Sequence, residues 1–117
     1  MDHRVQKVIR LINQSPTREL RLSDMAETVN LSPSRFYQIF KTEVGVPPTR
    51  YLKSLRMKMA KELLENTFLS VKEIMLRVGA SDESHFVRDF KREYRMTPSQ
   101  YRAHHLNGKG IADLASK

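Results

Sequence analysis

The sequence predicts an all-α fold of about seven helices, in which a corner of two helices occurs twice. Two observations support this prediction. Apolar residues recur at helical spacing along most of the 117-residue chain, and the alternating pattern of strands is nearly absent. A segment in the middle of the chain also matches a segment about fifty residues later, which indicates an internal repeat.

Three helices are predicted before residue 46. The first has apolar residues at i, i+3, i+4 and i+7, is capped by Asp2 and ends at Ser15-Pro16. Ser23 is the predicted cap of the second, and Asn30 lies at the turn after it, because asparagine tolerates positive φ. Ser32-Pro33 begins the third. The predicted inward residues are Val5, Val8, Ile9, Ile12, Met25, Ala26, Val29, Phe36, Ile39 and Phe40.

A longer helix is predicted over about 49–66, followed by three shorter ones. Capping boxes at Ser70-Glu73 and Thr97-Gln100 begin the first and last of these three. We therefore expect one subdomain at 1–48, a linker helix at 49–66, a second subdomain at 67–105 and a flexible tail at 106–117. The predicted inward residues are Tyr51, Leu52, Leu55, Met59 and Leu63 in the long helix, and Val71, Ile74, Met75, Val78, Phe86 and Phe90 beyond it.

The internal repeat aligns residues 36–51 with residues 86–101 without a gap. Phe36, Phe40, Lys41, Glu43, Pro48 and Tyr51 recur as Phe86, Phe90, Lys91, Glu93, Pro98 and Tyr101. The preceding helices also match, with Ser32 paired to Ser81, but their register differs by one residue. The second copy therefore contains one extra residue at its turn.

Each copy has the pattern of a helix-turn-helix motif. This motif needs a small residue in its first helix and a glycine or asparagine four positions later in the turn. Ala26 and Asn30 meet both requirements in the first copy, whereas Gly79 meets only the second requirement in the other copy, because Met75 is large. A single corner of two helices is common, but two copies in a small basic domain favour DNA binding.

The composition favours a nucleic-acid partner. The chain has 21 Lys and Arg against 13 Asp and Glu, a net charge of +8. The alternative interpretation is that this basic charge only aids solubility. The lack of cysteine excludes disulfides, thiolate zinc sites and cysteine nucleophiles. No segment approaches the roughly 20 apolar residues of a membrane span, and MDHRVQKVIR lacks the apolar core of a signal peptide, so we expect a cytoplasmic protein.

The outward faces of the third and sixth helices carry the candidate DNA-binding residues. Glutamine can form two hydrogen bonds to adenine and arginine can form two to guanine, while Ser and Lys suit bases or phosphates. Acidic residues are expected to be nearly absent from both faces, unlike an ordinary solvated surface. The candidates are Ser34, Arg35, Tyr37, Gln38 and Lys41 in the first copy and Ser81, Ser84, His85, Arg88, Lys91 and Arg92 in the second.

Over about residues 3–103 the sequence resembles the DNA-binding domain of the AraC/XylS family of bacterial transcription regulators. The matching residues are Tyr51, Leu52, Arg56, Ala60, Leu63 and Leu64 in the linker helix, Ser70, Val71, Glu73, Ile74, Val78, Gly79, Ser84, His85, Phe86, Arg88, Phe90 and Lys91 in the second copy, and Thr97, Pro98, Tyr101 and Arg102 at its end. The resemblance implies two helix-turn-helix subdomains, similar to tandem homeodomains, joined by a long linker helix. It also implies that two recognition helices, at about 33–43 and 82–94, enter successive major grooves. The implied base-contact positions are Ser34, Tyr37, Gln38, Ser81, Ser84, His85 and Arg88.

Three residues depart from the family's pattern. Met75 stands where alanine is usual, Ala80 where an aromatic residue is usual, and Arg95 where glycine is frequent. Methionine adapts to irregular gaps, so we expect Met75 to fill the space that Ala80 leaves.

The resemblance implies double-stranded DNA as the partner of this domain, which we expect to act as a monomer, with RNA polymerase as a further candidate partner. Family members often carry a separate ligand-sensing domain, through which a full-length protein could dimerise. We expect this chain to be either a stand-alone regulator or a domain of a longer protein.

Other function classes find less support in the sequence. There is no glycine-rich phosphate loop and no metalloprotease motif, so we expect no enzyme, cofactor or metal site. Asp82, His85 and Asp89 share a helix and could hold a metal, but local ion pairs are the commoner role of such groups on a basic surface. A helical protein-interaction module remains an alternative, and it would ignore duplex DNA at moderate salt. No aromatic-bearing sheet of an RNA-binding module is predicted.

Overall fold

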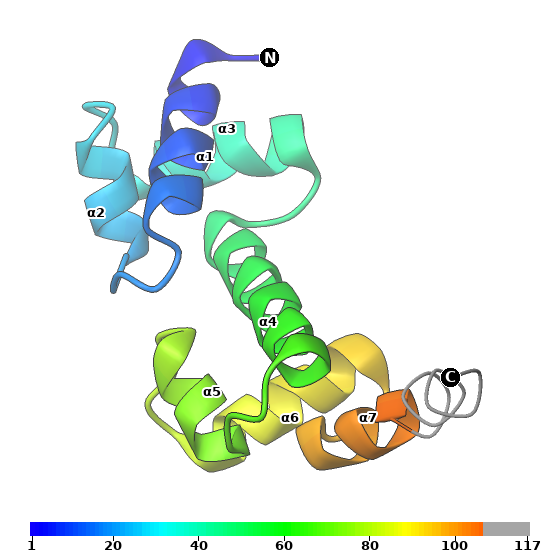
Figure 1. Ribbon diagram of the computed structural model, residues 1–117. Coiled ribbons are helices and arrows are strands. Elements are labelled where there is room, and N and C mark those ends of the chain that lie inside the picture. The colour runs from blue at the N-terminus through cyan, green and yellow to red at the C-terminus, as the bar shows by residue number, and fades with distance from the viewer. Residues whose placement is uncertain (107–117) are drawn as a thin grey trace. The chain divides into compact units, whose positions relative to one another are not determined.

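The computed structural model describes residues 1–106, which form seven α-helices and no strand (Figure 1). The helices are α1 (His3–Gln14), α2 (Leu22–Glu27), α3 (Pro33–Val44), α4 (Pro48–Asn66), α5 (Val71–Arg77), α6 (Glu83–Tyr94) and α7 (Pro98–His105). The predicted all-α fold is therefore confirmed. The tail expected at 106–117 lies outside the described residues, except for Leu106. None of the helices in the described part of the chain is long and apolar enough to cross a membrane.

The chain divides into two compact units, Met1–Arg56 and Met57–Lys117. In unit 1, α3 packs against both α1 and α2, and in unit 2, α6 packs against both α5 and α7 (Figure 1). The boundary falls inside α4. Each half of the predicted linker helix is therefore part of a core rather than a separate spacer.

The helix starts follow local capping chemistry. Asp2 accepts the backbone N–H of Arg4 at 2.8 Å, and Ser32 accepts that of Arg35 at 3.2 Å. Both predicted capping boxes are present, at Ser70-Glu73 and at Thr97-Gln100.

The prediction that Ser23 caps α2 was wrong. The helix begins one residue earlier, at Leu22, and the carboxylate of Asp24 accepts the backbone N–H of Arg21 at 2.9 Å. An acidic side chain in the third helical position can satisfy the N-terminal donor from inside the helix. A serine cap at position 23 is therefore not required.

The core of unit 1 joins α1, α2, α3 and the start of α4. Phe40 lies between two other rings, with ring centroids 5.7 Å from those of both Phe36 and Tyr51. Arg56 fixes the loop after α1, because its guanidinium donates to the carbonyls of Pro16 and Arg18, each at 2.7 Å. The buried residues of this core are Val5, Val8, Ile12, Leu20, Met25, Ala26, Phe36, Phe40 and Leu52.

The core of unit 2 joins the end of α4 to α5, α6 and α7. Phe90 contacts the rings of Phe86, Tyr94 and Tyr101. Arg102 fixes the loop after α4 by donating to the carbonyls of Leu64 and Thr67, at 3.4 and 3.2 Å. The buried residues of this core are Met57, Ala60, Leu64, Ile74, Met75, Val78, Phe86 and Phe90.

The single apolar stripe predicted for α4 was wrong. Leu52 is buried in the core of unit 1, whereas Met57, Ala60 and Leu64 are buried in that of unit 2, and the predicted Met59 and Leu63 are only partly buried. Residues five positions apart, such as Leu52 and Met57, do not share a face of an α-helix. The helix therefore contributes a different side to each core, which a search for one periodic stripe does not detect.

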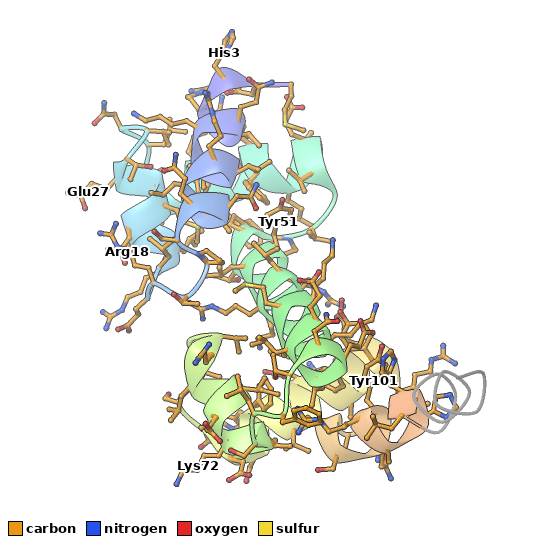
Figure 2. The ribbon with its side chains drawn as sticks, in the orientation of Figure 1. His3, Arg18, Glu27, Tyr51, Lys72 and Tyr101 are labelled. Carbon is orange, nitrogen blue, oxygen red and sulfur yellow. The ribbon has the colours of Figure 1, made fainter. Side chains whose placement is uncertain are left out.

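The structure extends the internal repeat beyond the segments that the sequence aligned. Val5, Val8 and Ile12 of α1 have the spacing of Met57, Ala60 and Leu64 of α4, and both sets are buried. Each residue from 32 to 50 is buried, half-buried or exposed like the residue fifty positions later. In Figure 2, Tyr51 lies near the start of α4 and Tyr101 in α7, the equivalent places in the two units. Thus α4 is both the last helix of the first copy and the first helix of the second.

The turn between the helices of each motif has the same backbone geometry in both units. Asn30 and Gly79 take positive φ, at 57° and 86°. The next backbone N–H, of Leu31 or Ala80, donates to Ala26 or Met75 respectively, at 3.1 and 3.0 Å. A left-handed residue that closes this bond ends the first helix and redirects the chain.

The extra residue of the second turn is Ser81. Ser32 caps α3, but its structural counterpart at the start of α6 is Asp82, which accepts the backbone N–H of His85 at 2.9 Å. The pairing of Ser32 with Ser81 was therefore wrong by one residue. Serine and aspartate are comparable N-caps, so residue type alone did not identify the equivalent positions.

Arg95 takes the role of a helix-ending glycine. Gly45 ends α3 with φ of 94°, and Arg95 ends α6 with φ of 64°. Their backbone N–H groups donate to the carbonyls of Lys41 and Lys91 respectively. The departure at position 95 therefore does not prevent helix termination.

Candidate nucleic-acid interface

The candidate DNA-binding residues lie on matching outward faces of α3 and α6. Ser34, Arg35, Gln38 and Lys41 are exposed on α3, and Ser84, His85, Arg88 and Lys91 are exposed at the equivalent positions of α6. Tyr37 is half-buried, like its counterpart Val87. Arg92 is exposed on α6, and Ser81 is exposed in the turn before it.

The outward face of α3 is mainly neutral and basic. The ammonium of Lys41 lies 6.0 Å from the centroid of the Tyr37 ring, at the long end of a cation–π contact. No hydrogen bond or ion pair holds the side chain of Arg35 within residues 1–106. Its five N–H donors are therefore available to an anion or a base.

The start of α6 holds a small network of charges. The carboxylate of Asp82 accepts the backbone N–H of His85 and lies 3.9 Å from Nδ1 of that imidazole. The backbone hydrogen bond from His85, with smaller contributions from the charges of His85 and Arg88, lowers the pKa of Asp82. Asp82 is therefore ionised at neutral pH, and the positive charge of Arg88 contributes to this.

The expectation that acidic residues are nearly absent from both faces was wrong for α6. From cap to last residue, α3 has Arg35 and Lys41 against Glu43, a net charge of +1. The same stretch of α6 has three exposed basic residues, Arg88, Lys91 and Arg92, against three exposed acidic residues, Asp82, Glu83 and Glu93, and Asp89 is half-buried at the position equivalent to Ile39. With Asp89 included, the net charge of this stretch is −1. Nε of Arg88 lies 4.0 Å from the carboxylate of Asp89.

An open depression beside α3 adds a residue that the sequence did not indicate. It is lined by the outward part of α3 and by Asp2 and Arg4, at the start of α1. Sequence periodicity places Arg4 on the polar side of α1, but only the packing of α1 against α3 brings it beside the candidate residues. Thr42, the counterpart of Arg92, also lines this depression.

No group of three His, Asp or Glu side chains within residues 1–106 is arranged to hold a metal ion. The carboxylate of Asp82 lies 3.9 Å from Nδ1 of His85, and that of Asp89 lies 4.0 Å from Nε of Arg88.

Comparisons with known proteins identify the family. A family model described as a helix-turn-helix domain matches residues 25–104, which is more than half of the chain. A solved transcriptional regulator with an AraC-type DNA-binding domain, from Chromobacterium violaceum, is 27% identical with a TM-score of 0.78, and the match covers 87% of this chain and 91% of that one.

The chain belongs to the AraC/XylS family. The HTH-type transcriptional regulator MtrA of Neisseria gonorrhoeae is 35% identical to this AraC/XylS domain over 102 residues. That match covers 87% of this chain but 33% of MtrA, so the chain spans about a third of the length of such a relative.

The AraC/XylS fold is also shared with a domain solved on DNA. The DNA-binding domain of AdpA, in complex with a target DNA, has a TM-score of 0.88, and the match covers 93% of this chain and 98% of that one. Its identity is 22%, so this likeness concerns the fold alone.

Proposed function

We propose that this chain binds duplex DNA at specific sequences and regulates transcription, with α3 and α6 as its two recognition helices in successive major grooves. The observation that carries this proposal is the matched pair of outward faces. Two helices at equivalent places of a repeat present polar and basic side chains at the same four positions. A helix enters the major groove with its exposed face toward the base edges.

The side chains on these faces suggest a division of roles. Gln38 and Arg88, at equivalent positions, have the chemistry to contact adenine and guanine through two hydrogen bonds each. Lys41, Lys91 and Arg92 follow toward the helix ends and suit phosphates. Ser34, Ser84, Arg35, His85, Tyr37 and Ser81 are the further candidate contacts.

We also propose that one copy of the domain occupies a site as a monomer. A helix of 19 residues, such as α4, is about 28 Å long, which is comparable to the roughly 34 Å of one turn of DNA. A single chain with two recognition helices therefore has no need of a dimer to contact two grooves. RNA polymerase is the partner through which we infer that a bound regulator acts, in the cytoplasm where bacterial DNA lies.

Selection of bound sequences from a random duplex library tests the proposal. We expect a motif without two-fold symmetry, made of two blocks whose centres lie about 10 base pairs apart. A palindromic motif would contradict binding as a monomer. Absence of any enriched sequence would contradict specific DNA binding and would favour the protein-interaction module.

A further inference from the structure

The depression beside α3 collects positive charge from two helices. Its volume is about 680 Å³, and it is lined by Arg4 of α1 together with Arg35 and Lys41 of α3. The carboxylates of Asp2 and Glu43 also line it, so its side chains carry three positive charges against two negative ones. Tyr37 and Gln38 add a hydroxyl and an amide to the same lining. It thus adjoins the outward face of α3 and has the donors that an anion requires.

Asp2 holds the guanidinium of Arg4 at the edge of this depression. Nη2 of Arg4 lies 2.9 Å from one carboxylate oxygen of Asp2, and Nε lies 3.2 Å from the other. The Arg4 side chain remains 44% exposed, so a competing anion can reach it. The hydrogen bonds from Arg4 lower the pKa of Asp2 to about 2, so this carboxylate is charged at neutral pH.

The residue of α4 that is equivalent to Arg4 has a different role. The buried triplets that begin at Val5 and Met57 are 52 positions apart, so the residue equivalent to Arg4 is Arg56. Arg56 donates to the carbonyls of Pro16 and Arg18 and is half-buried, and its burial lowers its pKa. It serves the structure of unit 1, so of these two equivalent arginines Arg4 is the one that is free to meet a ligand.

The position of the depression suits the DNA backbone. An α-helix with its side chains is about 10–12 Å wide and fills a major groove of about 12 Å, so groups at its flank meet the phosphates that border the groove. Arginine binds phosphate through two parallel hydrogen bonds, the geometry that Asp2 now occupies.

We propose that the depression holds a backbone phosphate of the DNA strand beside α3, that Arg4 is a ligand of this phosphate, and that Asp2 limits the affinity for DNA by competing for Arg4. This inference rests on the proposed function, because it requires α3 to lie in a groove. It assigns a DNA contact to α1, which lies outside both proposed recognition helices.

Four variants test the inference on the full chain, with a labelled duplex that carries the selected site. Arg4→Gln removes the proposed phosphate ligand, and we expect about threefold weaker binding and a salt slope flatter by about 0.9, the effect of one phosphate. Asp2→Asn keeps a side chain that caps helices well, releases Arg4, and should tighten binding by about threefold.

The double variant should bind like Arg4→Gln, because the gain requires Arg4. Arg10→Gln is the matched control, since Arg10 is exposed on the same helix but does not line the depression.

The outcomes separate this inference from the proposed function. If the unaltered chain binds its site but Arg4→Gln and Arg10→Gln have equal effects, the depression is not a phosphate site and specific DNA binding stands. Unchanged affinity in Asp2→Asn overturns the competition by Asp2. A gain in Asp2→Asn that is lost in the double variant supports the inference, because it cannot come from unfolding and requires Arg4. A gain that persists in the double variant comes from the lost negative charge alone and overturns the competition for Arg4. If the unaltered chain selects no sequence, both proposals fail.

Discussion

Equivalent residues of the two recognition helices differ in chemistry although they share a position. Gln38 corresponds to Arg88, and Arg35 corresponds to His85. An amide suits adenine and a guanidinium suits guanine, so the two halves of the site should differ in sequence. The repeated backbone therefore supports two different recognition surfaces.

Arg88 is the residue whose loss should change sequence preference most. Arg88→Ala should cost about 1–3 kcal/mol of binding free energy and relax the preference at one position in one block, because two hydrogen bonds to guanine are lost. Binding-site selection on this variant, at the salt concentration used for the unaltered chain, is the measurement. Lys41→Ala is the comparison and should weaken all sequences alike if that ammonium meets a phosphate. A motif that stays the same at every position in Arg88→Ala would remove Arg88 from base recognition.

Tyr101 should make stability depend on alkaline pH. Its hydroxyl donates to the carboxylate of Glu65, and partial burial together with this bond raises its pKa to about 12 from an ordinary value of 10.0. A raised pKa in the fold means that the stabilisation is complete below pH 10 and is lost as the pH rises toward 12. Tyr101→Phe should lower the free energy of unfolding by about 0.5–1.5 kcal/mol at neutral pH. In this variant the free energy of unfolding should also decrease less as the pH rises above 10.

Denaturant titrations from pH 7 to 11 measure this dependence. Tyr51→Phe is the control, because Tyr51 occupies the equivalent place in unit 1 and its ring packs on Phe40 without a hydrogen bond to a carboxylate. Equal pH profiles in the two variants would contradict the role of the bond to Glu65.

At the scale of elements, the two helix-turn-helix motifs exchange a large and a small residue. Unit 1 has Ala26 in the first helix and Leu31 after the turn, whereas unit 2 has Met75 and Ala80 at the positions with the same backbone hydrogen bond. Ala26 and Met75 are buried, and Leu31 and Ala80 pack against the same cores. This exchange agrees with the expectation that Met75 occupies the space that Ala80 leaves.

The exchange predicts non-additive stability changes in unit 2. Met75→Ala should destabilise by about 2–5 kcal/mol, because it leaves a cavity. Ala80→Leu should over-pack the same region at a cost of about 1–3 kcal/mol. The double variant reproduces the arrangement of unit 1 and should recover much of both losses, as measured by denaturant unfolding of all three proteins. Additive losses in the double variant would refute the idea that the two residues share one space.

The features that the sequence predicted are those with a local cause. Helix caps depend on residues within four positions, so Asp2, Ser32 and both capping boxes were predicted correctly. The burial of Phe36 and Phe40, and of their counterparts Phe86 and Phe90, follows from helical periodicity and is also confirmed.

The features that the sequence missed depend on contacts between elements. The two sides of α4 are determined by two different cores, and the place of Arg4 beside α3 is determined by the packing of α1. The acidic character of α6 could have been found in the sequence, because Asp82, Glu83, Asp89 and Glu93 all lie in the predicted recognition helix or at its cap. Which candidates contact DNA stays a prediction until binding is measured.

At the scale of the whole molecule, the two units differ in net charge. Met1–Arg56 has ten Lys and Arg against five Asp and Glu, a net charge of +5, and Met57–Lys117 has eleven against eight, a net charge of +3. Both units are therefore basic, but unit 1 has the larger excess and the recognition helix with net positive charge.

This charge predicts strongly salt-dependent binding of DNA. If roughly six phosphates are neutralised, the logarithm of the affinity should fall with the logarithm of the salt concentration with a slope of about −5 or steeper. Fluorescence anisotropy of a labelled duplex over a range of salt concentrations gives the slope. A nearly flat titration would favour a protein-interaction module whose basic charge is incidental.

The shared helix α4 has a consequence for dissecting this domain into fragments. A cut at the boundary after Arg56 divides its 19 residues into pieces of nine and ten, and isolated helices below about 12–15 residues are marginal in water. The core of unit 1 would keep only the first half of α4, and the core of unit 2 only the second half. Neither half is long enough to form a stable helix without the other. To keep each core intact, the two fragments must overlap so that both contain the whole of α4, for example 1–66 and 48–106. Two proteins made in this way would together be longer than the chain from which they derive.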